Sequence, residues 1–407
     1  MKTLAIGVLG FVLLSGCGSD DDSGSVKALE TMGMLGVPSP TLIGQNVMLV
    51  DATLNGHPGG RLLVDTGSPL TLMNAAFFTG AMLAMQAQTE VDVGLGALTI
   101  DSVPVLQITG GAMDRLRLAG ILGGNVLRQF PTNFNYRDRQ FQIGGMAMPS
   151  DVAPATVIPF KLSGGGEGTL NGKVIRYLAT RVPLKVSVEG KEYQFVLDTG
   201  ASDVTLRSSV FDTLIADGRH VIDDMPISTV LGPSKARVAR ARSVAVGSEI
   251  VTDIPVLSFE DSILDAMSNE LGYTVDGLLG GDYLREFSLT VDYPAGRVEL
   301  SRYANRAHIV DEFKRVGFWL ASSGATTFAV SSVCGDSAAE KLGVSVGDAV
   351  VSIEGQPLDG LDIFAVDALL NGAPGSSHRI GFGQTREATL ANTEVMIPVE
   401  DLVRGAN

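Results

Sequence analysis

Two short motifs in this chain each carry an aspartate in a form that suits paired acid–base chemistry. The first reads Leu-Val-Asp-Thr-Gly-Ser around Asp65, and the second reads Val-Leu-Asp-Thr-Gly-Ala around Asp198. Two carboxylates held about 3 Å apart cannot both ionise, so such a pair shares one proton. The ionised member can take a proton from a water molecule while the protonated member hydrogen-bonds the carbonyl under attack. Asp65 and Asp198 are therefore the candidate catalytic residues of a hydrolysis that needs no metal, no cofactor and no covalent intermediate.

An internal repeat extends well beyond the two motifs. Residues 120–143 align without gaps to residues 277–300, and eight of these 24 positions are identical. Each motif follows an alternating apolar pattern with a two-residue turn, Asn-Gly or Glu-Gly, which favours a β-hairpin. These patterns predict a mainly β chain with two homologous lobes, residues 41–150 and 151–305, and short helices at residues 74–78, 209–216 and 262–271.

The repeat resembles the aspartic peptidases, both pepsin-like and retropepsin-like, over roughly residues 40–303. The resemblance rests on the two Asp-Thr-Gly motifs and on the later runs ILGGNVL and LLGGDYLREF, which look like that family's second signature. It implies two β-barrel lobes that form one cleft, and an endopeptidase that hydrolyses extended polypeptide substrates. A chain can keep a fold and lose its activity, so the alternative is an inactive lipoprotein scaffold that binds peptides through its C-terminal domain.

The residues around the two aspartates have expected supporting roles. Glycine lets the loop backbone approach the carboxylates closely, and the resemblance implies that two threonines hydrogen-bond across the loops. The expected supporting residues are Thr66, Gly67, Ser68, Thr199, Gly200 and Ala201, with Gly123 and Gly280 packed beneath the loops.

The two loops differ at the residue after Asp-Thr-Gly. Ser68 could donate a hydrogen bond to the outer oxygen of Asp65, whereas Ala201 cannot do so for Asp198. Loss of a donor to the ionised form raises a carboxyl pKa. We therefore expect a pH optimum less acidic than that of a pepsin.

The second lobe is longer than the first between its motif and its Gly-Gly turn. Asp65 and Gly123 are 58 positions apart and Asp198 and Gly280 are 82 apart, a difference of 24. This excess fits a substrate-covering hairpin, or flap, whose tip we expect at Gly232, Pro233 and Ser234. An ordinary surface insertion is the alternative.

The N-terminus has the pattern of an export signal. Lys2 precedes a short apolar run that ends in Leu-Ser-Gly-Cys, which resembles the lipobox of bacterial lipoproteins. This predicts a signal peptide at residues 1–16, lipidation of Cys17 and a polar tether at residues 17–40. By the same resemblance, Gly18 favours the outer membrane, with the protein facing the periplasm. A secretory signal with an incidental cysteine is the alternative.

The last hundred residues have no counterpart earlier in the chain. The run SAAEKLGVSVGDAVVSIEGQPL resembles the PDZ domains of bacterial envelope proteases and predicts such a domain over residues 310–407. PDZ domains bind an extended peptide as an added strand. The carboxylate-binding loop is expected at Val316, Gly317, Phe318 and Trp319, although Trp319 could equally be a core residue and the domain could only pack against the lobes.

The overall composition narrows the choice of partners. The 407 residues include 30 Lys and Arg against 45 Asp and Glu, a net charge of −15, which argues against a nucleic-acid partner. The four histidines show no metal-ligand spacing, so we expect no metal. The expected partners are a polypeptide substrate, a peptide or protein ligand of the PDZ domain, and the membrane through Cys17.

Overall fold

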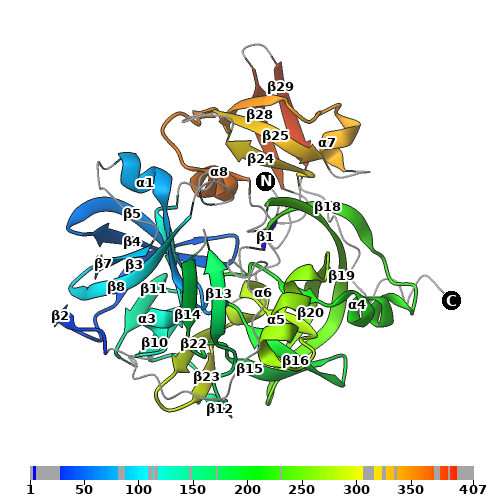
Figure 1. Cartoon of the computed structure of the whole chain (residues 1–407). Coiled ribbons are helices and arrows are strands. Elements are labelled where there is room, and N and C mark those ends of the chain that lie inside the picture. Colours follow the sequence, from blue (N-terminus) through cyan, green and yellow to red (C-terminus); the bar gives the residue numbers. More distant parts are fainter. Residues whose placement is uncertain are drawn as a thin grey trace.

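The computed structural model describes residues 3–5, 28–80, 88–108, 113, 118–145, 149–170, 173–229, 232–305, 316–322, 327–333, 337–370, 376–383 and 386–391. These residues form two β-barrel lobes and a separate C-terminal sheet domain (Figure 1). The expectation of a mainly β chain with two similar lobes is confirmed. Cys17 lies outside the described residues.

The first lobe is a closed barrel of six strands. In order around the barrel they are β4 (Val47–Leu54), β5 (His57–Val64), β9 (Gly120–Leu122), β6 (Thr71–Asn74), β8 (Leu98–Ile108) and β7 (Gln88–Leu95). The pairing of β7 with β4 closes the barrel. Asn55 and Gly56 join β4 to β5 with φ angles of 49° and 76°, the left-handed geometry that a tight hairpin requires.

The second lobe repeats this barrel strand for strand. Its strands are β15 (Pro183–Val188), β16 (Lys191–Leu197), β21 (Gly277–Leu279), β17 (Val204–Leu206), β20 (Glu249–Ser258) and β19 (Gly232–Val246). The pairing of β19 with β15 closes the barrel. The turn from β15 to β16 again has left-handed residues, with φ angles of 48° at Glu189 and 84° at Gly190.

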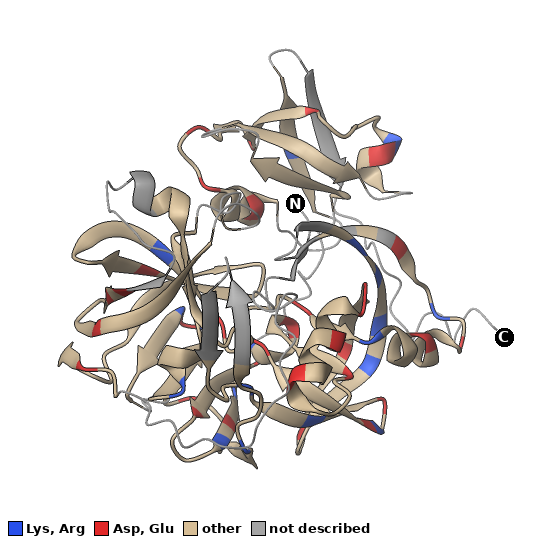
Figure 2. Ribbon diagram, viewed as in Figure 1, with Lys and Arg blue, Asp and Glu red and all other residues tan. Residues whose placement is uncertain are grey.

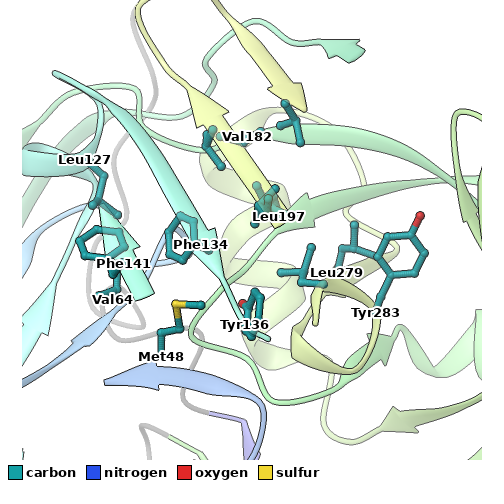
Figure 3. Packing of buried hydrophobic residues seen from close by; sticks show 14 of the residues in the cluster. Met48, Val64, Leu127, Phe134, Tyr136, Phe141, Val182, Leu197, Leu279 and Tyr283 are labelled. Carbon is teal, nitrogen blue, oxygen red and sulfur yellow. The ribbon is translucent and has the colours of Figure 1, made fainter. Parts of the chain in front are cut away.

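One antiparallel sheet joins the two lobes. Its strands are β12 (Thr156–Pro159), β23 (Arg297–Arg302), β22 (Phe287–Asp292), β10 (Pro131–Asn135), β11 (Gln140–Ile143) and β3 (Ser39–Gly44). The central pair, β10 and β22, comes from the repeated segments, and its register places Asn133 opposite Thr290. A continuous buried core crosses this boundary, from Met48 and Val64 to Leu197 and Tyr283 (Figure 3).

The remaining elements of the lobes lie around the barrels. They are β1 (Thr3–Ala5), β2 (Thr31–Gly33), β13 (Gly166–Leu170), β14 (Lys173–Tyr177), β18 (Ile222–Thr229), α1 (Ala75–Gly80), α3 (Gly124–Leu127), α4 (Ser208–Ile215), α5 (Ser262–Leu271) and α6 (Gly281–Leu284). Helices α1, α4 and α5 lie at the three expected places. β1 falls within the expected signal peptide and pairs in parallel with β18.

A hairpin of β18 with β19 extends the second lobe, and the described residues of the first lobe show no counterpart. The residues expected at its tip, Gly232, Pro233 and Ser234, are instead the first residues of β19, where they pair with Thr229, Ser228 and Ile227. Residues 230–231 lie outside the described residues. Figure 2 shows several Lys and Arg along β19, and these include Arg237, which pairs with Asp212 at 2.7 Å.

The C-terminal domain is a single curved sheet with two helices. The elements are β24 (Phe318–Ser322), β25 (Phe328–Val333), α7 (Ala338–Lys341), β26 (Ala349–Ile353), β27 (Gln356–Pro357), α8 (Ile363–Leu369), β28 (Ser377–Phe382) and β29 (Arg386–Ala391). Within the described residues β24 is an edge strand.

The C-terminal domain contacts both lobes. On the first lobe, the Phe364 ring of α8 packs so closely on Gly44 that a Cβ there would collide with it. Arg61 of β5 also donates to Asp362 Oδ2 at 2.6 Å. On the second lobe, Trp319 of β24 packs in one buried cluster with residues of the β18–β19 hairpin. None of the described helices is long and apolar enough to cross a membrane.

Candidate active site

The two candidate aspartates occupy matching places in the two barrels. Asp65 follows β5 and Asp198 follows β16, so each lies where its loop leaves the barrel. The backbone N–H of Asp65 donates to Leu122 O at 3.0 Å, and that of Asp198 donates to Leu279 O at 3.1 Å. In each lobe the strand that leads into the aspartate pairs in parallel with a short strand, β5 with β9 and β16 with β21. β9 and β21 therefore hold the two loops in equivalent ways.

Each carboxylate is held by the backbone of its own loop. Asp65 Oδ1 accepts from the N–H groups of Gly67 at 2.7 Å and Ser68 at 3.1 Å. Asp198 Oδ1 accepts from the N–H groups of Gly200 and Ala201, both at 3.0 Å. Both aspartates are fully buried, and the Oδ2 atom of each has no hydrogen-bond partner among the described groups. One oxygen of each carboxyl group is thus fixed and the other is available for chemistry.

The glycines bring the two loops against each other. A Cβ on Gly67 would collide with the carboxyl group of Asp198, and a Cβ on Gly200 would collide with that of Asp65. The structure therefore gives a steric reason for glycine at both positions, since each packs on the carboxylate of the other lobe. This contact brings Asp65 and Asp198 together from separate barrels.

The second pair of glycines lies under the loops. A Cβ on Gly123 would meet the carbonyl oxygen of Leu70, and a Cβ on Gly280 would meet that of Asp203. The residues that follow these glycines donate back to the loops: Gly124 N to Ser68 O at 2.7 Å and Gly281 N to Ala201 O at 2.8 Å.

The two threonines lock the loops together with four reciprocal hydrogen bonds. Thr66 Oγ1 donates to Leu197 O at 3.0 Å and accepts from Thr199 N at 3.0 Å. Thr199 Oγ1 donates to Val64 O at 2.9 Å and accepts from Thr66 N at 3.1 Å. All four bonds are buried, so their loss would leave unsatisfied polar groups away from water. The separation of the two carboxylates therefore depends on both threonines.

Burial and mutual repulsion control the ionisation of the pair. Burial raises the pKa of Asp65 from 3.8 to about 6, against the lowering effect of its hydrogen bonds. Burial and then the charge of Asp65 raise the pKa of Asp198 well above its ordinary value. At neutral pH the arrangement therefore favours one ionised and one protonated carboxyl group, which titrate as a pair.

Ser68 does not contact Asp65 through its side chain, contrary to the sequence-based expectation. Its hydroxyl donates to Leu70 O at 2.8 Å, so the loop turn satisfies it. The expected difference between Ser68 and Ala201 therefore does not distinguish the two carboxylates. The expectation of a pH optimum less acidic than a pepsin's stays a prediction and now has burial as its cause.

The residues expected to form a carboxylate-binding loop in the C-terminal domain are mostly interior. Val316 and Phe318 are fully buried in a core shared by the C-terminal domain and the first lobe. Gly317 has a φ of 85°, and a Cβ there would collide with Ser337. Trp319 is 3% exposed and contacts the second lobe, so it is an interdomain contact rather than an internal core residue of its own domain.

Arg181 is a residue of this site that the sequence alone did not single out. It lies two residues before the start of β15, its side chain is 1% exposed, and its Nη1 donates to Gly67 O in the Asp65 loop of the other lobe. A charged residue at the start of an apolar strand was the only available signal, and such residues are common.

Comparison with known families agrees with this geometry. A family model described as aspartyl protease matches residues 184–283, which include Asp198, Thr199, Gly200 and Gly280. Together with the two closed six-stranded barrels, this match fits an aspartic peptidase fold and supports a peptidase role. No curated protein matches the chain.

Proposed function

We propose that this protein is an aspartic endopeptidase in which Asp65 and Asp198 share one proton. The ionised carboxylate takes a proton from a water molecule as the water oxygen bonds to the scissile carbonyl carbon. The protonated carboxyl group gives its proton to the carbonyl oxygen, which forms a neutral tetrahedral diol. The carboxyl group that took the water proton then gives it to the amide nitrogen, while the other carboxylate takes a proton from a diol hydroxyl. The C–N bond breaks to leave an amine and a carboxylic acid, and the pair again holds one proton.

One observation supports this proposal above the others. Two fully buried carboxylates from homologous loops face each other, each fixed through Oδ1 and unpaired at Oδ2. A buried polar atom without a partner is costly, so it needs an explanation in a stable fold. A shared proton and a bound water would satisfy both Oδ2 atoms.

The test is cleavage of an unfolded protein such as reduced casein, with and without a statine inhibitor. Wild type should cleave and the inhibitor should stop it. Asp65→Asn and Asp198→Asn should each abolish cleavage and keep the wild-type circular dichroism spectrum. Asp359→Asn, at an exposed site, is the matched control. Absence of wild-type cleavage between about pH 3 and 8 would favour the inactive scaffold, and a single cut within the chain itself would indicate self-processing.

We also propose that the C-terminal domain is a PDZ-like module that binds an extended peptide or partner beside β24. The support is that β24 is an edge strand among the described strands of its sheet and that α8 packs next to it, since a peptide can add as a strand only at an edge. Peptides that end in a free carboxylate should bind, and their amidated forms should not. Equal binding of both forms would contradict the proposal. Trp319, the only tryptophan, provides a fluorescence signal.

Export as a lipoprotein is the third part of the proposal. Lipid on Cys17 would tether the peptidase to the bacterial envelope, facing the periplasm, and Gly18 favours the outer membrane. Cells that express the protein should incorporate labelled palmitate into wild type and into Cys334→Ser, but not into Cys17→Ser. Label that persists in Cys17→Ser would contradict lipidation at this cysteine.

A further inference from the structure

Arg181 is a buried cation beside the candidate active site. It has the largest volume of the fully buried side chains. Its Nη2 lies 3.0 Å from Oε2 of Glu270 on α5, and its Nε donates to Oε1 at 3.4 Å. Glu270 is itself 7% exposed. A buried ion pair is weak evidence for stability, so its retention here calls for another reason.

The guanidinium connects to Asp65 through one peptide group. Arg181 Nη1 donates to the carbonyl of Gly67, and the same peptide group ends in the N–H of Ser68, which donates to Asp65 Oδ1 at 3.1 Å. Hydrogen bonds in a chain polarise one another, and a nearby positive charge favours an ionised carboxyl group. The chain from guanidinium through peptide to carboxylate therefore stabilises the negative charge on Asp65.

Among the described residues, no equivalent chain reaches the Asp198 loop. When the register of each β-hairpin is continued to its aspartate, Val47 falls opposite Asp65 and Arg181 falls opposite Asp198. Val47 is therefore the first-lobe equivalent of Arg181. Val47 is fully buried in the core shared with the C-terminal domain, and a valine side chain cannot donate a hydrogen bond. The two lobes are thus alike in their Asp-Thr-Gly motifs and differ at this position, as they also do at Ser68 and Ala201.

We propose that Arg181 is a positioning residue that makes Asp65 the ionised member of the pair and Asp198 the member that carries the proton. Asp65 would then activate the water and Asp198 would protonate the scissile carbonyl. This inference rests on the proposed peptidase function and assigns the roles within it.

Several titratable groups surround Arg181. It faces Asp65, Asp198 and Glu270, with Tyr177 of β14 and Tyr293 after β22 also within electrostatic range. The charge of Arg181 lowers the pKa of both aspartates and acts more strongly on Asp198 than on Asp65, so the assignment rests on the hydrogen-bond chain to Asp65 and not on this direct interaction. Glu270 opposes Arg181, because its negative charge offsets the guanidinium.

The test measures kcat/KM as a function of pH and compares the position of the acidic limb between wild type and variants. The variants replace either Arg181 or Glu270, the two members of the ion pair. Arg181→Met should move the limb up by about one pH unit, with partial rescue by Arg181→Lys, because a lost cation disfavours ionisation. Glu270→Gln should move it down, because it removes the opposing anion. Arg219→Met is the matched control: that arginine is also buried, but it pairs with Glu189 and Asp217 in the second lobe. Its limb should not move.

Opposite shifts from one ion pair cannot arise from loosened packing. A limb that stays within about 0.2 pH unit of wild type in both Arg181→Met and Glu270→Gln would overturn the proposal. If Arg181→Met does not fold, Glu270→Gln decides alone. Carbon-13 NMR titration of labelled aspartates reads the same shifts without catalysis. Wild type that titrates as assigned but cleaves nothing would therefore refute the peptidase function and leave the role of Arg181 intact.

Discussion

Asp65→Asn should change how the stability of the protein depends on pH. The pKa of Asp65 is raised from 3.8 to about 6 in the folded chain, chiefly by burial. Such a carboxyl group stabilises the fold fully below its unfolded pKa and loses that contribution as pH rises through its folded pKa. Each pKa unit corresponds to about 1.4 kcal/mol, so the contribution lost between about pH 4 and 7.5 is roughly 2 to 3 kcal/mol.

Urea unfolding of wild type and Asp65→Asn at several pH values measures this contribution. The difference in free energy of unfolding, variant minus wild type, should increase by about 2 to 3 kcal/mol as the pH rises from about 4 to 7.5. Asp198 remains in both proteins, but its pKa falls when the charge of Asp65 is removed, so the measured difference belongs to the coupled pair. Asp359→Asn should run parallel to wild type. A constant difference between Asp65→Asn and wild type across this range would refute the argument from burial.

Three further substitutions test other parts of the structure. Thr199→Val leaves the Thr66 N–H without its acceptor, so it should lower the free energy of unfolding by about 1 to 3 kcal/mol and the cleavage rate at least tenfold. Thr199→Ser should keep the stability and the cleavage rate of wild type. Equal losses in the two variants would contradict the hydrogen-bond argument. Gly200→Ala places a methyl group against the Asp65 carboxyl group and should abolish cleavage without unfolding the chain, as circular dichroism can check. Trp319→Ala removes the contact with the β18–β19 hairpin, so hydrogen exchange should become faster there and stay unchanged in β7 and β8; unchanged exchange in the hairpin would contradict the contact.

The barrels could be predicted from the sequence because their signals are local. Alternating apolar residues and the turns at Asn55-Gly56 and Glu189-Gly190 define each hairpin within a few residues. The internal repeat then relates one lobe to the other. The helices were predicted for the same reason, as with α5, which ends at Gly272 in the left-handed conformation.

The errors arose where a short pattern had more than one structural outcome. Gly232-Pro233 has the composition of a turn, but Pro233 lies in β19 opposite Ser228. The Ser68 hydroxyl had two acceptors within reach, and the loop turn brings Leu70 O rather than the carboxylate to it. A sequence does not decide between such nearby alternatives without the backbone path.

The contacts between distant segments could not be predicted from one sequence. Arg181 contacts Gly67 across 114 positions of the chain, and Trp319 joins a cluster that includes Met225 and Ile227 of the second lobe. Nothing in the local pattern around either residue indicates its partner. The first of these contacts reaches the candidate active site, and the second joins the C-terminal domain to the β18–β19 hairpin.

The most direct test of the central claim is a peptide library digested by purified wild type and by Asp198→Asn, with the products read by mass spectrometry. If the two aspartates form a catalytic pair, wild type should cut internal peptide bonds at preferred sequences and Asp198→Asn should leave every peptide intact. Cleavage by the variant at the same bonds and at a rate near that of wild type would contradict the account.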